Sequence, residues 1–336
     1  MIIQLKKDID TRQKAAIIKK VNSFKYEANE VRTQKGTYLI GIGSNEFDIR
    51  QIGNMPGIED IHIVSDSYKL VSRKWKVKPT IIDLGDGVTI GQGSLAIIAG
   101  PCSIEGEEQI VDTIEHLRSN GIRMMRGGVF KPRSSPYAFR GLGIDGLKLW
   151  YKYAKEAGIK IVTEVMEVAQ IEPMLEYVDV FQVGARNTQN FNLLDALGDV
   201  DKPVMIKRGI SGTIDELLYS AEYVFSGGNE RLILCERGIR TYEKASRNTM
   251  DLNAIPILKE KTHFPVVADP SHGIGIRRHV EAIALASVMA GADGVIYETH
   301  ANPFKAFSDG QQTIDFREST QLVKKLKAAY ELLKSF

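Results

Sequence analysis

Eight short apolar runs alternate with longer stretches of helical periodicity from residue 95 onward. The runs cover residues 95–99, 122–125, 159–162, 180–183, 203–206, 231–234, 265–268 and 294–297. Helical spacing of apolar residues marks 106–119, 145–157, 214–225, 279–290 and 314–333. Eight strand–helix units within about 240 residues predict a (β/α)8 TIM barrel of the α/β class. A doubly wound parallel sheet is the alternative, but Gly-Pro-Cys-Ser rather than a phosphate-binding glycine motif follows the first run.

The first 65 residues predict a small separate domain. Strands are expected at 2–5, 26–33, 37–42 and 58–64, and helices at 11–21 and 48–55. The resulting order, βαββαβ, is typical of ferredoxin-like and ACT-type α+β domains. The segment has no carboxylates, cysteines or histidines at ligand spacing, so we expect it to regulate rather than catalyse. A plain oligomerisation domain is the alternative.

A basic stretch and a hairpin connect this domain to the barrel. Residues 66–80 are predicted to be a linker, and 81–90 a hairpin around the turn Gly85-Asp86-Gly87. We expect the hairpin to close one end of the barrel. The predicted organisation is therefore a regulatory domain over 1–65, a linker and hairpin over 66–92, and a catalytic barrel over 93–336.

Composition narrows the possible cellular settings and partners. The chain has 336 residues, 43% of them hydrophobic, and a net charge of +2, so it has no global basic field for nucleic acid. No apolar run approaches the roughly 20 residues of a membrane span, and no signal-peptide pattern is present. The two cysteines, Cys102 and Cys235, form no disulfide framework. We therefore expect a cytoplasmic protein that binds neither nucleic acid nor membrane.

Cations gather where the predicted barrel strands end. The loop at 126–136 follows the second run and holds three cations among glycines, prolines and serines. Side chains at the carboxyl ends of barrel strands share one mouth. The cations expected there are Arg126, Lys131, Arg133, Arg186, Lys207 or Arg208, and Arg237, with Glu236 the alternative to Arg237. Their convergence predicts a ligand with several negative charges.

A possible metal set reaches the same mouth. Cys102, His272 and Glu298 follow the first, seventh and eighth runs, and Asp309 lies in the loop after the eighth. A thiolate, an imidazole and two carboxylates can together hold a divalent ion. Cys235 lies within a strand and is expected to be a core thiol.

Four motifs carry a family resemblance. They are Ala99-Gly100-Pro101-Cys102-Ser103, Gly127-Gly128-Val129-Phe130-Lys131-Pro132-Arg133-Ser134-Ser135, Ala268-Asp269-Pro270-Ser271-His272 and Ser308-Asp309-Gly310. The chain resembles 3-deoxy-D-arabino-heptulosonate 7-phosphate (DAHP) synthase of the type I β subgroup, with an N-terminal ferredoxin-like domain, over nearly its whole length. The related 3-deoxy-D-manno-octulosonate 8-phosphate (KDO8P) synthases usually carry Ala-Asn where this chain has Pro132-Arg133. Ser134 departs from the threonine common in the family but keeps the hydroxyl.

The resemblance implies a role for each candidate residue. The implied metal ligands are Cys102, His272, Glu298 and Asp309, for Mn²⁺ first and Fe²⁺, Co²⁺, Zn²⁺ or Cd²⁺ as alternatives. The phosphoenolpyruvate (PEP) carboxylate falls to Arg126, Lys131 and Lys207, and the PEP phosphate to Arg186 and Arg237 with main chain near Ala185. The phosphate end of erythrose 4-phosphate falls to Arg133 and Ser134. The implied catalytic residues are Lys131, Glu164, which lies near the attacking water, and Asp309.

The implied activity is that of a transferase. It joins PEP to erythrose 4-phosphate in a metal-dependent aldol-type condensation that yields DAHP and phosphate, the first step of the shikimate pathway to aromatic amino acids. Feedback inhibition by tyrosine or phenylalanine at the N-terminal domain and a homotetramer are further expectations. KDO8P synthase, with arabinose 5-phosphate as the aldose, is the alternative enzyme, and a non-catalytic sensor of phosphorylated metabolites is the alternative class.

Overall fold

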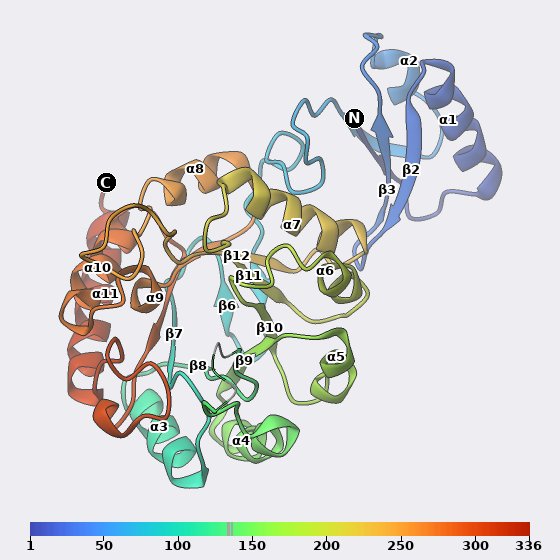
Figure 1. Ribbon diagram of the computed structural model, residues 1–336. Helices are drawn as coiled ribbons and strands as arrows, with labels where there is room; N and C mark the ends of the chain where they lie inside the picture. The colour runs from blue at the N-terminus through green and yellow to red at the C-terminus, as the bar shows by residue number, and fades with distance from the viewer. Residues whose placement is uncertain (133–134, 136) are drawn as a thin grey trace.

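The computed structural model describes residues 1–132, 135 and 137–336 and is built around a closed eight-stranded barrel (Figure 1). Its strands are β7 (Ala96–Gly100), β8 (Met124–Arg126), β9 (Lys160–Val165), β10 (Val180–Val183), β11 (Val204–Lys207), β12 (Leu232–Glu236), β13 (Val266–Ala268) and β14 (Gly294–Glu298). All neighbouring pairs are parallel, and β14 pairs with β7 to close the ring. The predicted (β/α)8 fold is confirmed.

Helices surround the barrel, as Figure 1 shows. They are α3 (Glu107–Ser119), α4 (Gly143–Ala157), α5 (Val168–Met174), α6 (Phe191–Gly198), α7 (Ile214–Ser226), α8 (Ala254–Lys261), α10 (Val280–Met289) and α11 (Phe316–Lys334). Short helical turns α9 (Pro270–Ile274), η1 (Arg277–His279) and η2 (Pro303–Lys305) lie in the last loops. Capping boxes begin α7 at Thr213 and α11 at Asp315, which satisfies free N–H groups there. No helix in the described ranges is long and apolar enough to cross a bilayer.

The hairpin of β5 (Ile82–Asp83) and β6 (Thr89–Ile90) fills one end of the barrel. Ile82 and Ile90 are buried in one cluster with the inward-facing side chains of the barrel strands. Arg123 and Arg231, which directly precede strands β8 and β12, donate to carbonyl oxygens in the hairpin. The hairpin therefore closes the amino-terminal end, and chemistry is left to the opposite mouth.

The N-terminal unit contains the expected elements in the expected order. They are β1 (Ile2–Leu5), α1 (Thr11–Ser23), β2 (Glu27–Arg32), β3 (Thr37–Ile42), α2 (Arg50–Gly53) and β4 (Ile58–His62). The antiparallel sheet has the order β2-β3-β1-β4, and one face packs on both helices in its own core. Helix α2 is a single turn, shorter than the predicted 48–55.

The other face of this sheet packs against the barrel beside α7 (Figure 1). The Tyr38 ring lies 5.4 Å from Trp75 and 6.4 Å from Phe225 of α7, measured between centroids. Glu222 of α7 accepts hydrogen bonds from the backbone N–H groups of residues 69, 70 and 71. The connecting stretch is thus fixed on the barrel surface, while the domain boundaries at 65 and 92 stay predictions.

Candidate active site

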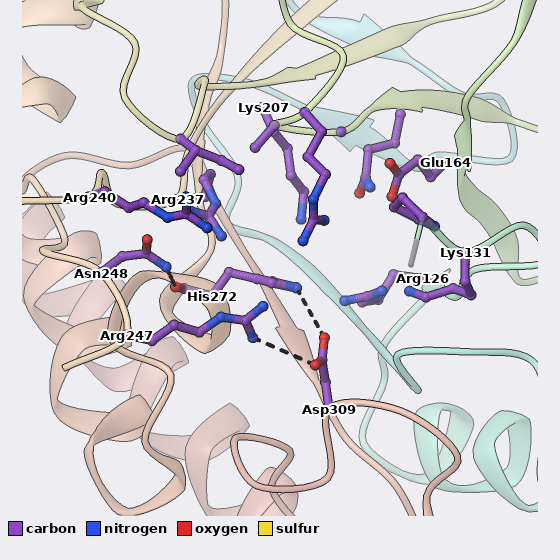
Figure 2. Close-up of a pocket in the computed structure, with 16 residues that line it drawn as sticks. Arg126, Lys131, Glu164, Lys207, Arg237, Arg240, Arg247, Asn248, His272 and Asp309 are labelled. Carbon is purple, nitrogen blue, oxygen red and sulfur yellow. Dashed lines mark hydrogen bonds and ion pairs between the residues drawn. The ribbon is translucent and has the colours of Figure 1, made fainter. Parts of the chain in front are cut away.

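A polar cavity of about 160 Å³ opens at the carboxyl ends of the barrel strands (Figure 2). Among the described residues, seven cations line it: Arg126, Lys131, Arg186, Lys207, Arg237, Arg240 and Arg247. The other lining residues are Pro132, Glu164, Gln182, Gly184, Ala185, Ile210, Asn248, His272 and Asp309. This excess of positive charge in a recess fits a ligand with more than one anionic group.

The four predicted metal ligands lie close together beside this cavity, which His272 and Asp309 line. Ligand atoms of Cys102, Glu298 and Asp309 all lie within 4.8 Å of one another. His272 Nε2 lies 3.5 Å from Glu298 Oε1 and 4.0 Å from Asp309 Oδ2. Residues separated by more than 200 positions in the chain are thereby brought together by strands β7 and β14 and the loops that follow β13 and β14.

Neighbouring groups influence the protonation state of the predicted metal ligands. His272 Nδ1 lies 2.8 Å from Asp269 Oδ2, which directs the lone pair of Nε2 toward the cluster when Nδ1 carries the proton. Burial and the nearby Glu298 raise the pKa of Cys102 to about 11. Burial opposes ionisation of Glu298, but His272 and Arg126 outweigh it and lower its pKa. The carboxylate is charged in this site, and a cation is needed to hold the thiol as thiolate.

Two buried ion pairs fix cations beside the cluster. Arg126 Nη1 lies 2.9 Å from Glu298 Oε1, and both side chains are almost fully buried. Lys207 Nζ lies 2.5 Å from Asp269 Oδ2. Burial disfavours the charged form of Asp269, yet His272 and Lys207 together hold its pKa well below the usual range. These cations therefore stay in place before any ligand arrives.

The sequence left open whether Lys207 or Arg208, and whether Glu236 or Arg237, faces the mouth. The structure shows which member of each pair does. Lys207 and Arg237 line the cavity. Arg208 points elsewhere and donates to Glu236 Oε2 at 2.9 Å and to Asp251 Oδ2 at 2.8 Å. Cys235 lies in the barrel interior, where burial raises its pKa, as expected for a core thiol.

Comparisons with known proteins agree with this arrangement. A model described as the DAHP synthetase I family matches residues 76–335. The chain belongs to this family. A phospho-2-dehydro-3-deoxyheptonate aldolase from Thermotoga maritima is 42% identical over 334 residues, which are 99% of this chain and 98% of the relative. A 2-dehydro-3-deoxyphosphooctonate aldolase from Syntrophobacter fumaroxidans is 32% identical over 266 residues, which are 74% of this chain and 91% of the relative.

Solved structures give the same assignment. A crystal structure of the T. maritima phospho-2-dehydro-3-deoxyheptonate aldolase (DAHP synthase) is 41% identical and has a TM-score of 0.79, covering 99% of this chain and 97% of its own. A truncated form of the T. maritima 3-deoxy-D-arabino-heptulosonate 7-phosphate synthase covers 80% of this chain and 98% of its own, at 44% identity and a TM-score of 0.75. Membership in the DAHP synthetase I family confirms the resemblance and the enzyme class, and sets aside the non-catalytic sensor.

The remaining predicted residues of this family member are placed as follows. Lys131 Nζ lies 2.9 Å from the Cys102 carbonyl oxygen and 3.1 Å from its Sγ. Glu164, Ala185 and Arg186 line the cavity. Arg133 and Ser134 lie outside the described residues. The predictions for these two side chains therefore rest on the sequence alone.

Several residues that line the cavity were not predicted from the sequence. Arg240 and Arg247 come from the loop between β12 and α8, and Asn248 donates to the His272 carbonyl oxygen at 2.8 Å. The second arginine of Arg237-Gly-Ile-Arg240, three residues after the first, indicates that this loop brings a further cation to the barrel mouth. Gln182 and Gly184 carry no charge and gave no signal.

Proposed function

We propose that this mouth catalyses the condensation of PEP with erythrose 4-phosphate to DAHP and inorganic phosphate, with a divalent metal ion bound. The observation that carries the proposal is that His272 and Asp309, two members of the Cys102–His272–Glu298–Asp309 set, line the same cavity as the cations. PEP brings a carboxylate and a phosphate, and the aldose brings a second phosphate. One cation-rich recess beside a metal set suits that combination.

The donor set fits a divalent transition ion. It offers one thiol, one imidazole nitrogen left available by the Nδ1 contact with Asp269, and two carboxylates. The carboxylates suit Mn²⁺, and the thiol and the imidazole suit Fe²⁺, Co²⁺, Zn²⁺ or Cd²⁺. We propose Mn²⁺ first because the family resemblance implies it. Such an ion supplies Lewis-acid polarisation of the aldehyde oxygen.

PEP is held by the surrounding cations in this proposal. Its carboxylate binds Arg126, Lys131 and Lys207, and its phosphate binds Arg186 and Arg237 with main chain at Ala185. Arg126 Nε is buried with no hydrogen-bond partner among the described residues. Arg237 is 6% exposed, its pKa is lowered by burial, and no carboxylate of the described chain forms an ion pair with it. Each buried cation thus has donors left for a substrate anion.

The chain's own side chains also move protons. The methylene carbon of PEP bonds to the aldehyde carbon, and Lys131 gives a proton to the new alkoxide. Water adds to the second PEP carbon while Glu164 accepts its proton. Cleavage of the C–O bond then releases phosphate. Asp309 would be one of the residues that hold the metal ion.

Other features of the proposal concern the rest of the assembly. Arg133 and Ser134 bind the phosphate of erythrose 4-phosphate. The enzyme is cytoplasmic, forms a homotetramer, and takes tyrosine or phenylalanine as an effector at its N-terminal domain. We propose these features because of the family resemblance; membership in the family does not by itself establish them.

A PEP-consumption assay tests the proposal. Purified enzyme is given erythrose 4-phosphate or arabinose 5-phosphate, with added Mn²⁺ or with EDTA. Rapid PEP loss with erythrose 4-phosphate, abolished by EDTA and restored by Mn²⁺, is expected. Faster turnover of arabinose 5-phosphate would identify a KDO8P synthase instead, and full activity in EDTA would remove the metal from the mechanism.

A further inference from the structure

A buried glutamine links one carboxylate of the metal set to a cavity arginine, and this arginine approaches a second carboxylate. Gln312 lies three residues after Asp309, and its side chain is fully buried. Its Nε2 donates to Glu298 Oε2 at 2.7 Å, and its Oε1 accepts from Arg247 Nη1 at 2.5 Å. Arg247 Nη1 also lies 3.6 Å from Asp309 Oδ1, the contact drawn in Figure 2.

The chemistry of the partners fixes which way the Gln312 amide points. A guanidinium can only donate hydrogen bonds, and a carboxylate can only accept them. The amide oxygen must therefore face Arg247, and the amide nitrogen must face Glu298. Turning the amide over would lose both bonds in a buried site, where an unpaired polar group is costly.

Two hydrogen bonds fix the orientation of the Glu298 carboxylate. Oε2 is held by Gln312, while Oε1 accepts from Arg126 and lies 3.5 Å from His272 Nε2. The Glu298 carboxylate is thus held at both oxygens and cannot rotate without breaking a bond. The Asp309 carboxylate contacts groups outside its own loop: Oδ1 lies 3.6 Å from Arg247 Nη1, and Oδ2 lies 3.4 Å from Cys102 Sγ.

We propose that Gln312 and Arg247 are positioning residues that hold Glu298 and Asp309 in ligating orientation and set the affinity of the metal site. Gln312 acts directly on Glu298. Arg247 orients Gln312 and approaches Asp309. The inference rests on the proposed function, because it takes the Cys102–His272–Glu298–Asp309 set as the metal site. Loss of such supporting hydrogen bonds typically weakens metal binding by roughly 10- to 100-fold.

Two adjacent glutamines give a matched test. Gln312→Met removes both amide bonds and keeps side-chain volume, and Gln311→Met changes an exposed neighbour. The dissociation constant of Mn²⁺ is measured on the full-length apoenzyme by competition with a chromophoric chelator. Gln312→Met should raise that constant by roughly 10- to 100-fold, and Gln311→Met should leave it within twofold of wild type.

The arginine provides a second line of evidence that does not depend on a core substitution. Arg247→Met should weaken Mn²⁺ binding in the same direction, and Arg240→Met, a change at another cavity arginine, should not. The double variant Arg247→Met/Gln312→Met should lose little more than Gln312→Met, because the pair acts as one unit. Activity of Gln312→Met should recover at saturating Mn²⁺.

The outcomes separate this inference from the proposed function. A Mn²⁺ constant unchanged in Gln312→Met, while Cys102→Ser loses Mn²⁺, would overturn the inference and keep the metal site. Mn²⁺ binding unchanged in Cys102→Ser as well would remove the metal site itself. Additive losses from Arg247→Met and Gln312→Met would show that the two residues do not act together.

Discussion

Gly184 decides where one catalytic candidate lies. A methyl group at this position would overlap Glu164 Oε1 and come within 2.7 Å of Glu164 Cδ. The overlapping atoms are the far end of a flexible side chain, so the barrel need not unfold to accept the methyl group. The glycine therefore gives the Glu164 carboxylate its place in the cavity.

Gly184→Ala should accordingly damage turnover more than stability. Displacement of the carboxylate should lower kcat by roughly tenfold or more, as expected for loss of a positioned proton acceptor. Steady-state kinetics and thermal unfolding measure the two effects. Gly209→Ala, at the end of β11, is the matched control because its nearest new contact is 3.5 Å away. Equal kinetic loss in both variants would show that Gly184 has no particular tie to Glu164.

At the residue scale, the sequence predicted the proximity of residues that stand in motifs, and it did not predict contacts that exist only in the folded chain. Residue type and position after a predicted strand single out Cys102, His272, Glu298 and Asp309 as candidate metal ligands. The choice between Lys207 and Arg208 depended on a one-residue register, which composition does not reveal. The sequence did not identify Gln312, because the role of a neutral amide depends on its contacts with Glu298 and Arg247, which only the structure shows.

Among the structural elements, the β5–β6 hairpin stabilises the barrel from the end opposite the site. Ile82 is 2% exposed and packs among the inward barrel side chains, whereas Ile81 is 53% exposed. Ile82→Ala should lower the free energy of unfolding by about 2–5 kcal/mol. The KM for PEP should not change, because the cavity lies at the other end. Chemical denaturation and kinetics on both variants check this, with Ile81→Ala expected to be nearly neutral.

A buried histidine between α3 and α11 should make stability depend on pH. His116 is 8% exposed, stacks on Phe316 with centroids 4.2 Å apart, and has its pKa lowered by burial to about 4. The unfolded chain binds a proton near pH 6.5 and the folded chain does not until about pH 4. Stability from the neutral ring is therefore complete above pH 6.5 and falls on acidification, by on the order of 3 kcal/mol at pH 4.

Urea unfolding across pH 4–7 measures this dependence. His116→Gln should reduce the slope between pH 6.5 and 4, although it lowers stability at pH 7 through lost stacking. The buried His263, whose pKa is also lowered by burial, keeps its own share of the slope. His279→Gln changes an exposed histidine and should leave the slope as in the wild type. A slope unchanged in His116→Gln would assign the acid sensitivity to other groups.

The elements with a clear hydrophobic pattern were the ones that the sequence predicted. Eight strands buried on both sides read as unbroken apolar runs, and long helices such as α7 and α11 show clear periodicity. Helices α5, α6 and α8 span only two turns or so, and α5 contains Pro173. Such short segments are held by packing against the barrel rather than by their own pattern, so sequence periodicity did not reveal them.

At the scale of the whole molecule, one carboxylate ties the N-terminal unit to the barrel. Glu230 is 1% exposed and lies just before β12. Its Oε1 accepts from Thr33 Oγ1 at 2.7 Å and from the Lys35 backbone N–H at 3.2 Å, both in the β2–β3 turn. Its Oε2 lies 3.8 Å from Lys76 Nζ. These contacts hold the small sheet at the side of the barrel, at the amino-terminal end of β12 and away from the mouth.

Feedback inhibition requires the N-terminal unit to favour a different arrangement when an effector binds. In the arrangement seen here the sheet packs on Trp75 and Phe225, and the cavity is open. An amino acid that binds both arrangements equally shifts nothing, so an inhibitor must bind more tightly where the mouth is covered. The family resemblance implies that tyrosine or phenylalanine has this property.

Tyrosine or phenylalanine should therefore slow the full-length enzyme and leave a truncated one unaffected. A chain starting at Asp66 keeps Trp75 and the Glu222 contacts that fix the connecting stretch on the barrel. PEP consumption by both proteins is measured against increasing amounts of each amino acid. Glu230→Gln weakens the attachment at the side of the barrel without touching the cavity, so inhibition should set in at lower effector concentration. If neither amino acid slows the full-length enzyme, or if the truncated chain responds equally, the N-terminal unit serves assembly instead of feedback.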